Sequence, residues 1–120
     1  MKTLLSILWA ANLWTTVAVA ECAQYGNATE LSGTISHGKW WPDDHPEDKR
    51  EFVVLALDAP ICLDEGNDAW SPPHASIEEV QIVGCVPTAP EGERVTLRGV
   101  LEGESLMSHR RPVLLVAECR

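Results

Sequence analysis

An apolar leader followed by four cysteines constrains this chain of 120 residues more than any other feature. Lys2 gives the leader a positive start, and the segment closes on Ala18-Val19-Ala20, the small-x-small pattern that signal peptidase cuts after. We therefore predict a signal peptide over residues 1–20 and a single domain over residues 21–120. A periplasmic or secreted location would leave the cysteines oxidised.

Two membrane-attached alternatives for the leader fit its residues less well. A transmembrane anchor needs about 20 predominantly apolar residues. Polar residues interrupt this stretch at Ser6, Asn12, Thr15 and Thr16. A lipoprotein would need a small residue before its acceptor cysteine, where this chain has Glu21. The sequence therefore predicts no stable membrane anchor after cleavage.

The four cysteines fit two disulfides, for which three connectivities are possible. They are Cys22, Cys62, Cys85 and Cys119. A domain of this size buries about 65% of its unfolded surface, so its core is adequate but small. In the chain-entropy model, closing a loop of about 35–40 residues contributes about 4 kcal/mol, which is comparable to the whole stability of a small domain.

The charge of the chain excludes some classes of partner. Its formal net charge is −9, and loss of Lys2 with the leader takes this to −10. Nucleic-acid binding depends on Lys and Arg side chains that release phosphate counterions, so this balance opposes it, and anionic lipids would be repelled as well. The charge favours solubility or a basic protein partner, such as a cationic secreted enzyme.

Five stretches with apolar alternation or β-branched residues predict strands separated by turns. They span residues 30–36, 51–57, about 78–83, 94–101 and 112–117. The fourth is the clearest, because apolar residues alternate there with Arg94, Thr96 and Arg98. No segment has a convincing period of 3.6 residues, so we predict little or no helix outside the leader.

Five short strands, with glycines inside the first and the fourth, predict a small all-β, OB-like Greek-key barrel. Gly33 and Gly99 lie where such strands coil sharply. In this topology the start of the first strand lies beside the end of the second, and the ends of the third and fifth strands lie together. The pairs that this arrangement permits without distortion are Cys22–Cys62 and Cys85–Cys119.

Short motifs are spread over most of the predicted domain. They are C-x-x-Y at 22–25, L-x-G-T-I at 31–35, L-D-x-P-I-C at 57–62, V-Q-I at 80–82, G-x-x-V-T-x-x-G-x-L at 92–101 and P-V-L-L at 112–115. As a set they resemble domain-of-unknown-function family 4431, small exported bacterial proteins without an assigned activity. The resemblance implies a fold and a compartment more than a function, and it supports the pairing of Cys22 with Cys62.

The chain departs from that family pattern in two places. Typical members have a helical stretch between the third and fourth strands, where this chain has only residues 86–91. The additional pair Cys85 and Cys119 would compensate for the lost packing. Members also tend to carry several histidines before the last strand, where this chain has His109 followed by two arginines. We therefore expect no metal site there.

Two Pro-rich loops, residues 37–50 and 65–76, carry all the tryptophans of the predicted domain. The candidate ligand-binding residues in them are Trp40, Trp41, Asp43, Asp44 and Trp70. OB folds use the loop between the first two strands to contact oligosaccharides or oligonucleotides, and indoles beside carboxylates suit stacking on sugar rings. The alternative is that Trp40 or Trp41 covers the open barrel end as part of the core.

No catalytic or cofactor motif accompanies these loops. The histidines lack a metal-ligand spacing, the acidic residues around Asp43 lack the spacing of a calcium loop, and no serine lies in a nucleophile elbow. We expect no catalytic residue, cofactor or metal. Two functions remain: a non-enzymatic binding or accessory module for a carbohydrate or another cell-envelope component, or an inhibitor or immunity-type protein whose acidic loop captures a basic partner.

Overall fold

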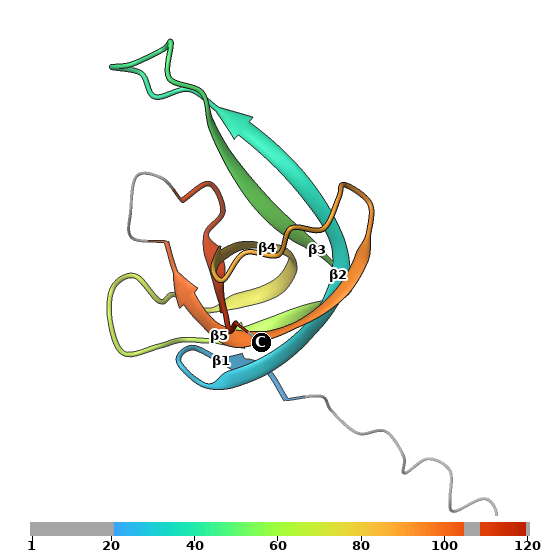
Figure 1. Ribbon diagram of the computed structural model, residues 1–120. Helices are drawn as coiled ribbons and strands as arrows, with labels where there is room; N and C mark the ends of the chain where they lie inside the picture. Colours follow the sequence, from blue (N-terminus) through green and yellow to red (C-terminus); the bar gives the residue numbers. More distant parts are fainter. Residues whose placement is uncertain (1–20, 105–108, 120) are drawn as a thin grey trace, which may run out of the picture.

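The computed structural model describes residues 21–104 and 109–119 (Figure 1). The predicted signal peptide lies outside this part of the chain. The described residues form six strands: β1 (Ala23–Gln24), β2 (Ala28–Trp40), β3 (Arg50–Asp64), β4 (His74–Gly84), β5 (Arg94–Gly103) and β6 (Val113–Ala117). They contain no helix, and so none long and apolar enough to cross a membrane.

Strands β2 to β6 close into a barrel with the strand order of an OB fold. β2 pairs antiparallel with β3 and with β5, and β5 pairs antiparallel with β6. β6 then runs parallel to β4, and antiparallel pairing of β3 with β4 closes the ring. The predicted OB-like barrel is therefore confirmed. β1, which adds a short parallel pairing to the end of β3, is too brief to have been recognised by alternation.

Apolar alternation along the strands builds the core of the barrel. On β2, Leu31 and Ile35 point inward, while their neighbours are more exposed. Leu55, Leu101 and Leu115, from three other strands, are fully buried in the same cluster. Burial of such a side chain contributes about 1.5–3 kcal/mol.

Two glycines allow the strands to coil as sharply as the barrel requires. A Cβ atom on Gly33 would lie 2.2 Å from the carbonyl oxygen of Ala56, and one on Gly99 would lie 2.2 Å from that of Val116. Backbone atoms cannot move away as a flexible side chain can, so only glycine permits this approach.

Both disulfides predicted from the barrel topology are confirmed. The Cα atoms of Cys22 and Cys62 are 4.7 Å apart, and those of Cys85 and Cys119 are 5.2 Å apart, as disulfide geometry requires. The first joins the residue before β1 to β3, and the second joins the end of β4 to the segment after β6. All four cysteines are paired, which is consistent with an extracellular location.

The strands extend further than the sequence predicts, and this corrects the placement of one candidate residue. β3 continues past Pro60 to Asp64 because the register with β4 shifts between Ala56 and Ile61, where a proline is tolerated. β2 continues to Trp40, which pairs with Arg50. The prediction that every tryptophan of the domain lies in a loop is therefore wrong for Trp40.

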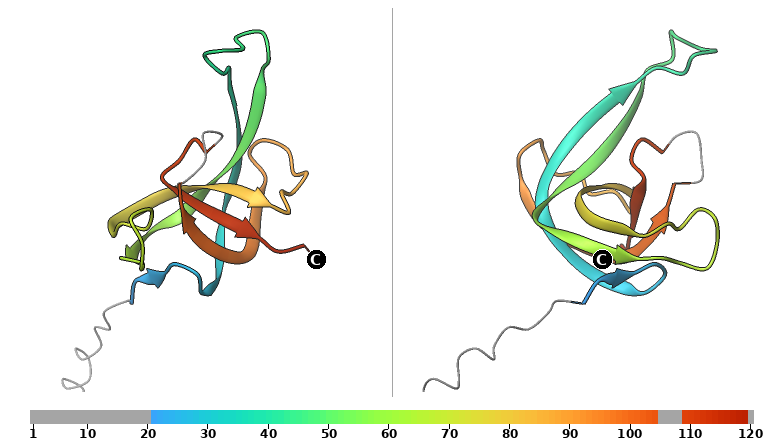
Figure 2. Two further views of the ribbon diagram at one scale, coloured as in Figure 1. Left: turned by 90° about the vertical axis from the view of Figure 1, so that its left-hand side faces the viewer. Right: turned by 180° about the vertical axis from the view of Figure 1, so that it is seen from behind.

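The end of β2 and the start of β3 project beyond the barrel as a two-stranded arm (Figure 1). The arm comprises residues 38–52, and residues 41–49 form its tip. The loop between β3 and β4, residues 65–73, lies on the same side of the barrel as the ends of the β5–β6 loop (Figure 2). The arm and these two loops surround the candidate site.

Candidate functional site

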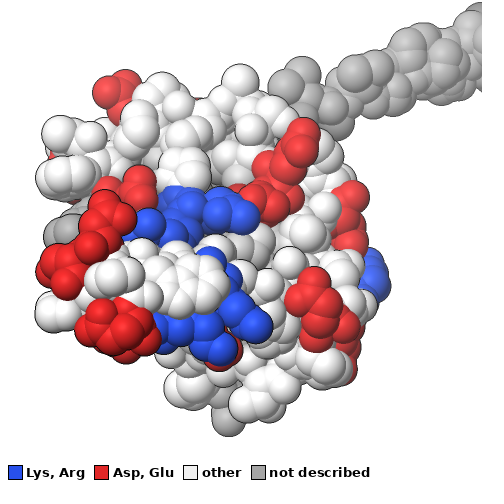
Figure 3. All heavy atoms as spheres, turned by 90° about the horizontal axis from the view of Figure 1, so that it is seen from above, with Lys and Arg blue, Asp and Glu red and all other residues white. Residues whose placement is uncertain are grey.

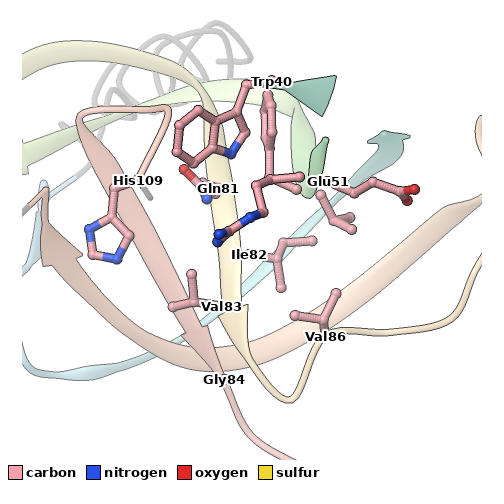
Figure 4. A pocket seen from close by; sticks show the side chains of 11 residues that line it. Trp40, Glu51, Gln81, Ile82, Val83, Gly84, Val86 and His109 are labelled. Carbon is pink, nitrogen blue, oxygen red and sulfur yellow. The ribbon is translucent and has the colours of Figure 1, made fainter. Parts of the chain in front are cut away.

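A hollow of about 520 Å³ lies between the base of the arm and the end of β4. It is lined by apolar side chains together with polar groups from the arm, β4 and the β5–β6 loop. The apolar members are Phe52, Val53, Ile82, Val83 and Val86, and the polar side chains include Arg50, Gln81 and His109. Figure 4 shows the Trp40 indole next to Gln81, and the Glu51 carboxylate pointing away from the other labelled side chains. The volume is in the range of small-molecule sites.

Trp40 separates this hollow from a second one, and it is held through its side chain. The guanidinium carbon of Arg110 lies 3.8 Å from the centre of the indole ring, a stacked cation–π contact. Trp40 is half-buried, lines both hollows and is not a member of the buried core cluster. It is therefore not part of the barrel core but part of the wall between these two hollows, which together we call the groove.

Gln81 on β4 positions the arginines that face the arm. Its side chain is 4% exposed, and its Oε1 atom accepts hydrogen bonds from the backbone N–H groups of Arg110 and Arg111. Arg111 also donates to the Glu79 carboxylate, and its guanidinium carbon lies 5.6 Å from the Phe52 ring centre. One buried amide thus fixes the backbone that carries two guanidinium groups over aromatic rings of the arm.

Sequence reasoning missed Gln81, Arg110 and Phe52 as members of this site. The available indication for Gln81 was a neutral amide inside an apolar strand, between Val80 and Ile82. Such a residue needs a buried hydrogen-bond partner, but the sequence does not say which segment supplies it.

The second hollow, of about 470 Å³, lies between the arm tip and the ends of the β5–β6 loop. Trp41, which is 52% exposed, lines it together with Asp43 and Asp44. The structure therefore brings four of the five candidate ligand-binding residues together around Trp40. Glu104 and Arg110 complete the lining from the other side.

Trp70 lies apart from these four residues. It is 61% exposed and lines a separate hollow of about 430 Å³ together with Tyr25, Asn67 and Asp68. Burial, and to a lesser extent the charge of Asp68, raises the pKa of Tyr25 above its ordinary value. Its hydroxyl donates a hydrogen bond of 2.7 Å to the carbonyl oxygen of Pro72.

The side of the molecule from which the arm projects has mixed charge, although the chain as a whole is acidic. Basic side chains gather in the middle of this face, with carboxylates around them (Figure 3). Arg50 donates to the Asp48 carboxylate over 2.8 Å, and this hydrogen bond raises the pKa of Arg50 above its ordinary value. The groove therefore offers fixed cations next to carboxylates instead of a field of one sign.

Comparisons with known protein families, with curated proteins and with solved structures find no match. The resemblance seen in the sequence therefore stays a prediction. Within residues 21–104 and 109–119, no cluster of three His, Cys, Asp or Glu side chains is placed to hold a metal ion. Indoles, apolar side chains, arginines and carboxylates that line the same hollows can bind a molecule that has both apolar faces and many hydroxyl groups.

Proposed function

We propose that this protein is an exported, non-enzymatic module that binds a carbohydrate between the arm and the β5–β6 loop. OB folds bind oligosaccharides or oligonucleotides on the face of their second and third strands, between the first and last interstrand loops. In this chain those strands are β3 and β4, and the arm and the ends of the β5–β6 loop flank them. The net charge opposes the oligonucleotide alternative.

The observation that carries the proposal is the stack of Trp40 on Arg110 between two hollows of mixed polarity. A sugar ring has C–H faces that pack on indoles and hydroxyls that both donate and accept hydrogen bonds. Asp43 and Asp44, which line the second hollow, supply acceptors, and Arg50, which lines the first, supplies donors. Because the stack orders Trp40 before binding, little side-chain freedom is lost when a ligand arrives.

A glycan array followed by calorimetry with the best-bound glycan tests this proposal. We expect Arg110→Ala to weaken binding about tenfold, the equivalent of about 1.4 kcal/mol, because the variant removes the cation that orders Trp40. Arg98→Ala is the matched control, since Arg98 lies on β5 and pairs with Glu118 at 3.5 Å, away from the groove. Absence of binding to every glycan, or turnover of a bound one, would overturn the proposal.

The projecting arm favours a second candidate, capture of a basic protein. Its tip extends beyond the barrel (Figure 1), and it carries the exposed Trp41, which lines one hollow together with Asp43 and Asp44. Such a complex would lose affinity steeply between low and physiological salt. A periplasmic protein retained at low salt by the wild type, but not by the Asp43→Asn/Asp44→Asn variant, would support capture. Equal retention by both proteins would contradict it.

Export is supported by the predicted leader and by the two disulfides. The protein isolated from the periplasm or medium should begin at Glu21, which intact-mass measurement detects directly. Retention of residues 1–20 in a membrane fraction would contradict export as a free domain.

A further inference from the structure

The hollow beside Trp70 combines aromatic rings with carboxylates. Tyr25 and Trp70 line it together with Asp68 and Glu102, and its volume is about 430 Å³. Among the described residues that line it, none is Lys, Arg or His. The first hollow at the arm, in contrast, is lined by an arginine and a histidine. The charge of the lining therefore makes the Trp70 hollow suitable for a cation.

The two carboxylates of this hollow have no basic partner within the protein. Within residues 21–104 and 109–119, neither Asp68 nor Glu102 forms an ion pair with Lys, Arg or His. The arginines that form ion pairs in this part of the chain do so with Asp48, Asp58, Glu79 and Glu118. Both negative charges of the hollow are therefore left for a cationic ligand.

The loop that carries Trp70 is fixed although its indole is 61% exposed. The Asp68 Oδ1 atom accepts hydrogen bonds from two neutral groups, the Trp70 backbone N–H over 2.9 Å and the Ser71 hydroxyl over 2.8 Å. The backbone also lies against β5, where a Cβ on Gly103 would come within 1.5 Å of the Trp70 carbonyl oxygen. An indole on an ordered backbone can contact a ligand without first ordering its loop.

The Tyr25 ring is fixed beside the same loop. Its hydroxyl donates a hydrogen bond of 2.7 Å to the Pro72 carbonyl oxygen, and a Cβ on Gly66 would lie 3.1 Å from its Cδ2 atom. Burial raises the pKa of Tyr25, and the charge of Asp68 raises it further, so the field of this carboxylate extends to the ring. A cation in the hollow would therefore lie near both an ordered aromatic ring and a negative charge.

We propose that this hollow binds a small quaternary ammonium cation of the choline class, with aromatic surface from Tyr25 and Trp70 and negative charge from Asp68 and Glu102. Aromatic rings attract such cations electrostatically. A bare ammonium group is more strongly hydrated and would lose more on entering the hollow. The site shares no lining residue with the two hollows around Trp40, so the inference does not depend on carbohydrate binding.

The charge of the lining also selects among ligands of this class. An anionic substituent on the ligand would meet two carboxylates and no basic side chain. Free choline should therefore bind more tightly than phosphocholine or glycine betaine, which carry a phosphate and a carboxylate.

Calorimetric titration of the protein with five small ions tests the inference. Choline and tetramethylammonium should bind, whereas methylammonium, phosphocholine and glycine betaine should each bind at least about tenfold more weakly. Absence of saturable choline binding overturns the proposal. Methylammonium that binds as tightly as choline overturns the quaternary class, and phosphocholine that binds as tightly overturns the role of the carboxylates.

Substitutions in the hollow locate the bound cation. Trp70→Leu keeps apolar volume but removes the ring, and it should weaken choline binding about tenfold, whereas Trp70→Phe should retain most of the affinity. Glu102→Gln should weaken binding several-fold. Glu93→Gln is its matched control, because it removes the same charge just before the opposite end of β5.

Two results with these variants would overturn the site. Wild-type affinity in Trp70→Leu would show that the ring does not contact the cation. Equal losses in Glu102→Gln and Glu93→Gln would show that choline responds only to the net charge of the protein. Unchanged thermal unfolding of Trp70→Leu and Glu102→Gln confirms that a loss of affinity reflects the missing ring or charge.

Discussion

The arm and the loop of residues 65–73 each present a tryptophan, but they hold it in opposite ways. Trp40 is half-buried and held through its side chain by the stack with Arg110. Trp70 is 61% exposed and held through its backbone, by Asp68 and by close contact with Gly103. The position of Trp40 therefore depends on neighbouring side chains, whereas the position of Trp70 depends on the fit of its backbone against the barrel.

The largest effect that distinguishes the two regions should come from the Cys22–Cys62 disulfide. Cys62 lies just before the 65–73 loop, whereas no disulfide joins the arm. We expect Cys22→Ala/Cys62→Ala to lower the free energy of unfolding by about 2–5 kcal/mol in urea denaturation. Amide exchange in the variant should increase around Trp70 before it increases in the arm.

Cys85→Ala/Cys119→Ala provides the control for this experiment. It removes a disulfide that closes a loop of similar length, with a sequence separation of 34 compared with 40, at the other end of β4. A comparable loss of stability without early exchange around Trp70 is the expected result. Early exchange at Trp70 in both variants would show that the loop depends on global stability and not on its own covalent tie.

Two glycine substitutions test the difference between backbone and side-chain support. A Cβ on Gly103 would lie 1.5 Å from the Trp70 carbonyl oxygen, whereas one on Gly38 in the arm would lie 2.3 Å from the Phe52 ring. The backbone cannot yield, but the ring can turn. Gly103→Ala should therefore lower the free energy of unfolding by up to about 3 kcal/mol, and Gly38→Ala by about 1 kcal/mol or less. Equal losses in urea denaturation would contradict the comparison.

The position of Trp40 on the arm should respond most to a substitution of Gln81. Gln81→Leu leaves the N–H groups of Arg110 and Arg111 without their buried acceptor, which should cost about 2 kcal/mol of unfolding free energy. The near-ultraviolet circular dichroism should also change as Trp40 loses its stacked cation. Gln81→Glu keeps an acceptor and should restore much of both properties. A Leu variant with wild-type stability and spectrum would refute the role of Gln81.

The barrel could be predicted because each of its determinants can be recognised from the residues themselves, without knowledge of how distant segments pack. Alternation along β5, the glycines that permit sharp coiling and the positions of the cysteines all point to one topology. The end of β3 was misplaced because Pro60 resembles a strand terminator unless the register shift that accommodates it is known. The predicted leader lies outside the described residues and stays a prediction.

The candidate site could be predicted only in part. Trp40, Trp41, Asp43 and Asp44 are near neighbours in the sequence, so any fold that forms a hairpin there brings them together. Gln81 and Arg110 are separated by 29 positions, and only the parallel pairing of β4 with β6 sets their contact. The separation of Trp70 from the arm likewise follows from how the loops pack on the barrel.

The smallest expected effect concerns Tyr25, the only tyrosine in the chain, which supports the 65–73 loop. Burial raises the pKa of Tyr25 above its ordinary value of 10.0, and the nearby Asp68 charge raises it further. The folded protein therefore holds this proton more tightly than the unfolded chain does. The resulting stability is fully present below pH 10 and is lost as the pH rises through the raised pKa.

Urea denaturation between pH 7 and pH 11, compared with Tyr25→Phe, measures this contribution. At neutral pH the Phe variant should be less stable by about 1 kcal/mol, because the hydrogen bond to the Pro72 carbonyl is lost. Above pH 10 the wild type should lose stability faster than the variant, since the variant has no phenol to ionise. Amide exchange in this range should increase in the 65–73 loop and not in the arm. Parallel stability profiles for the two proteins would show that Tyr25 titrates equally in the folded and unfolded states.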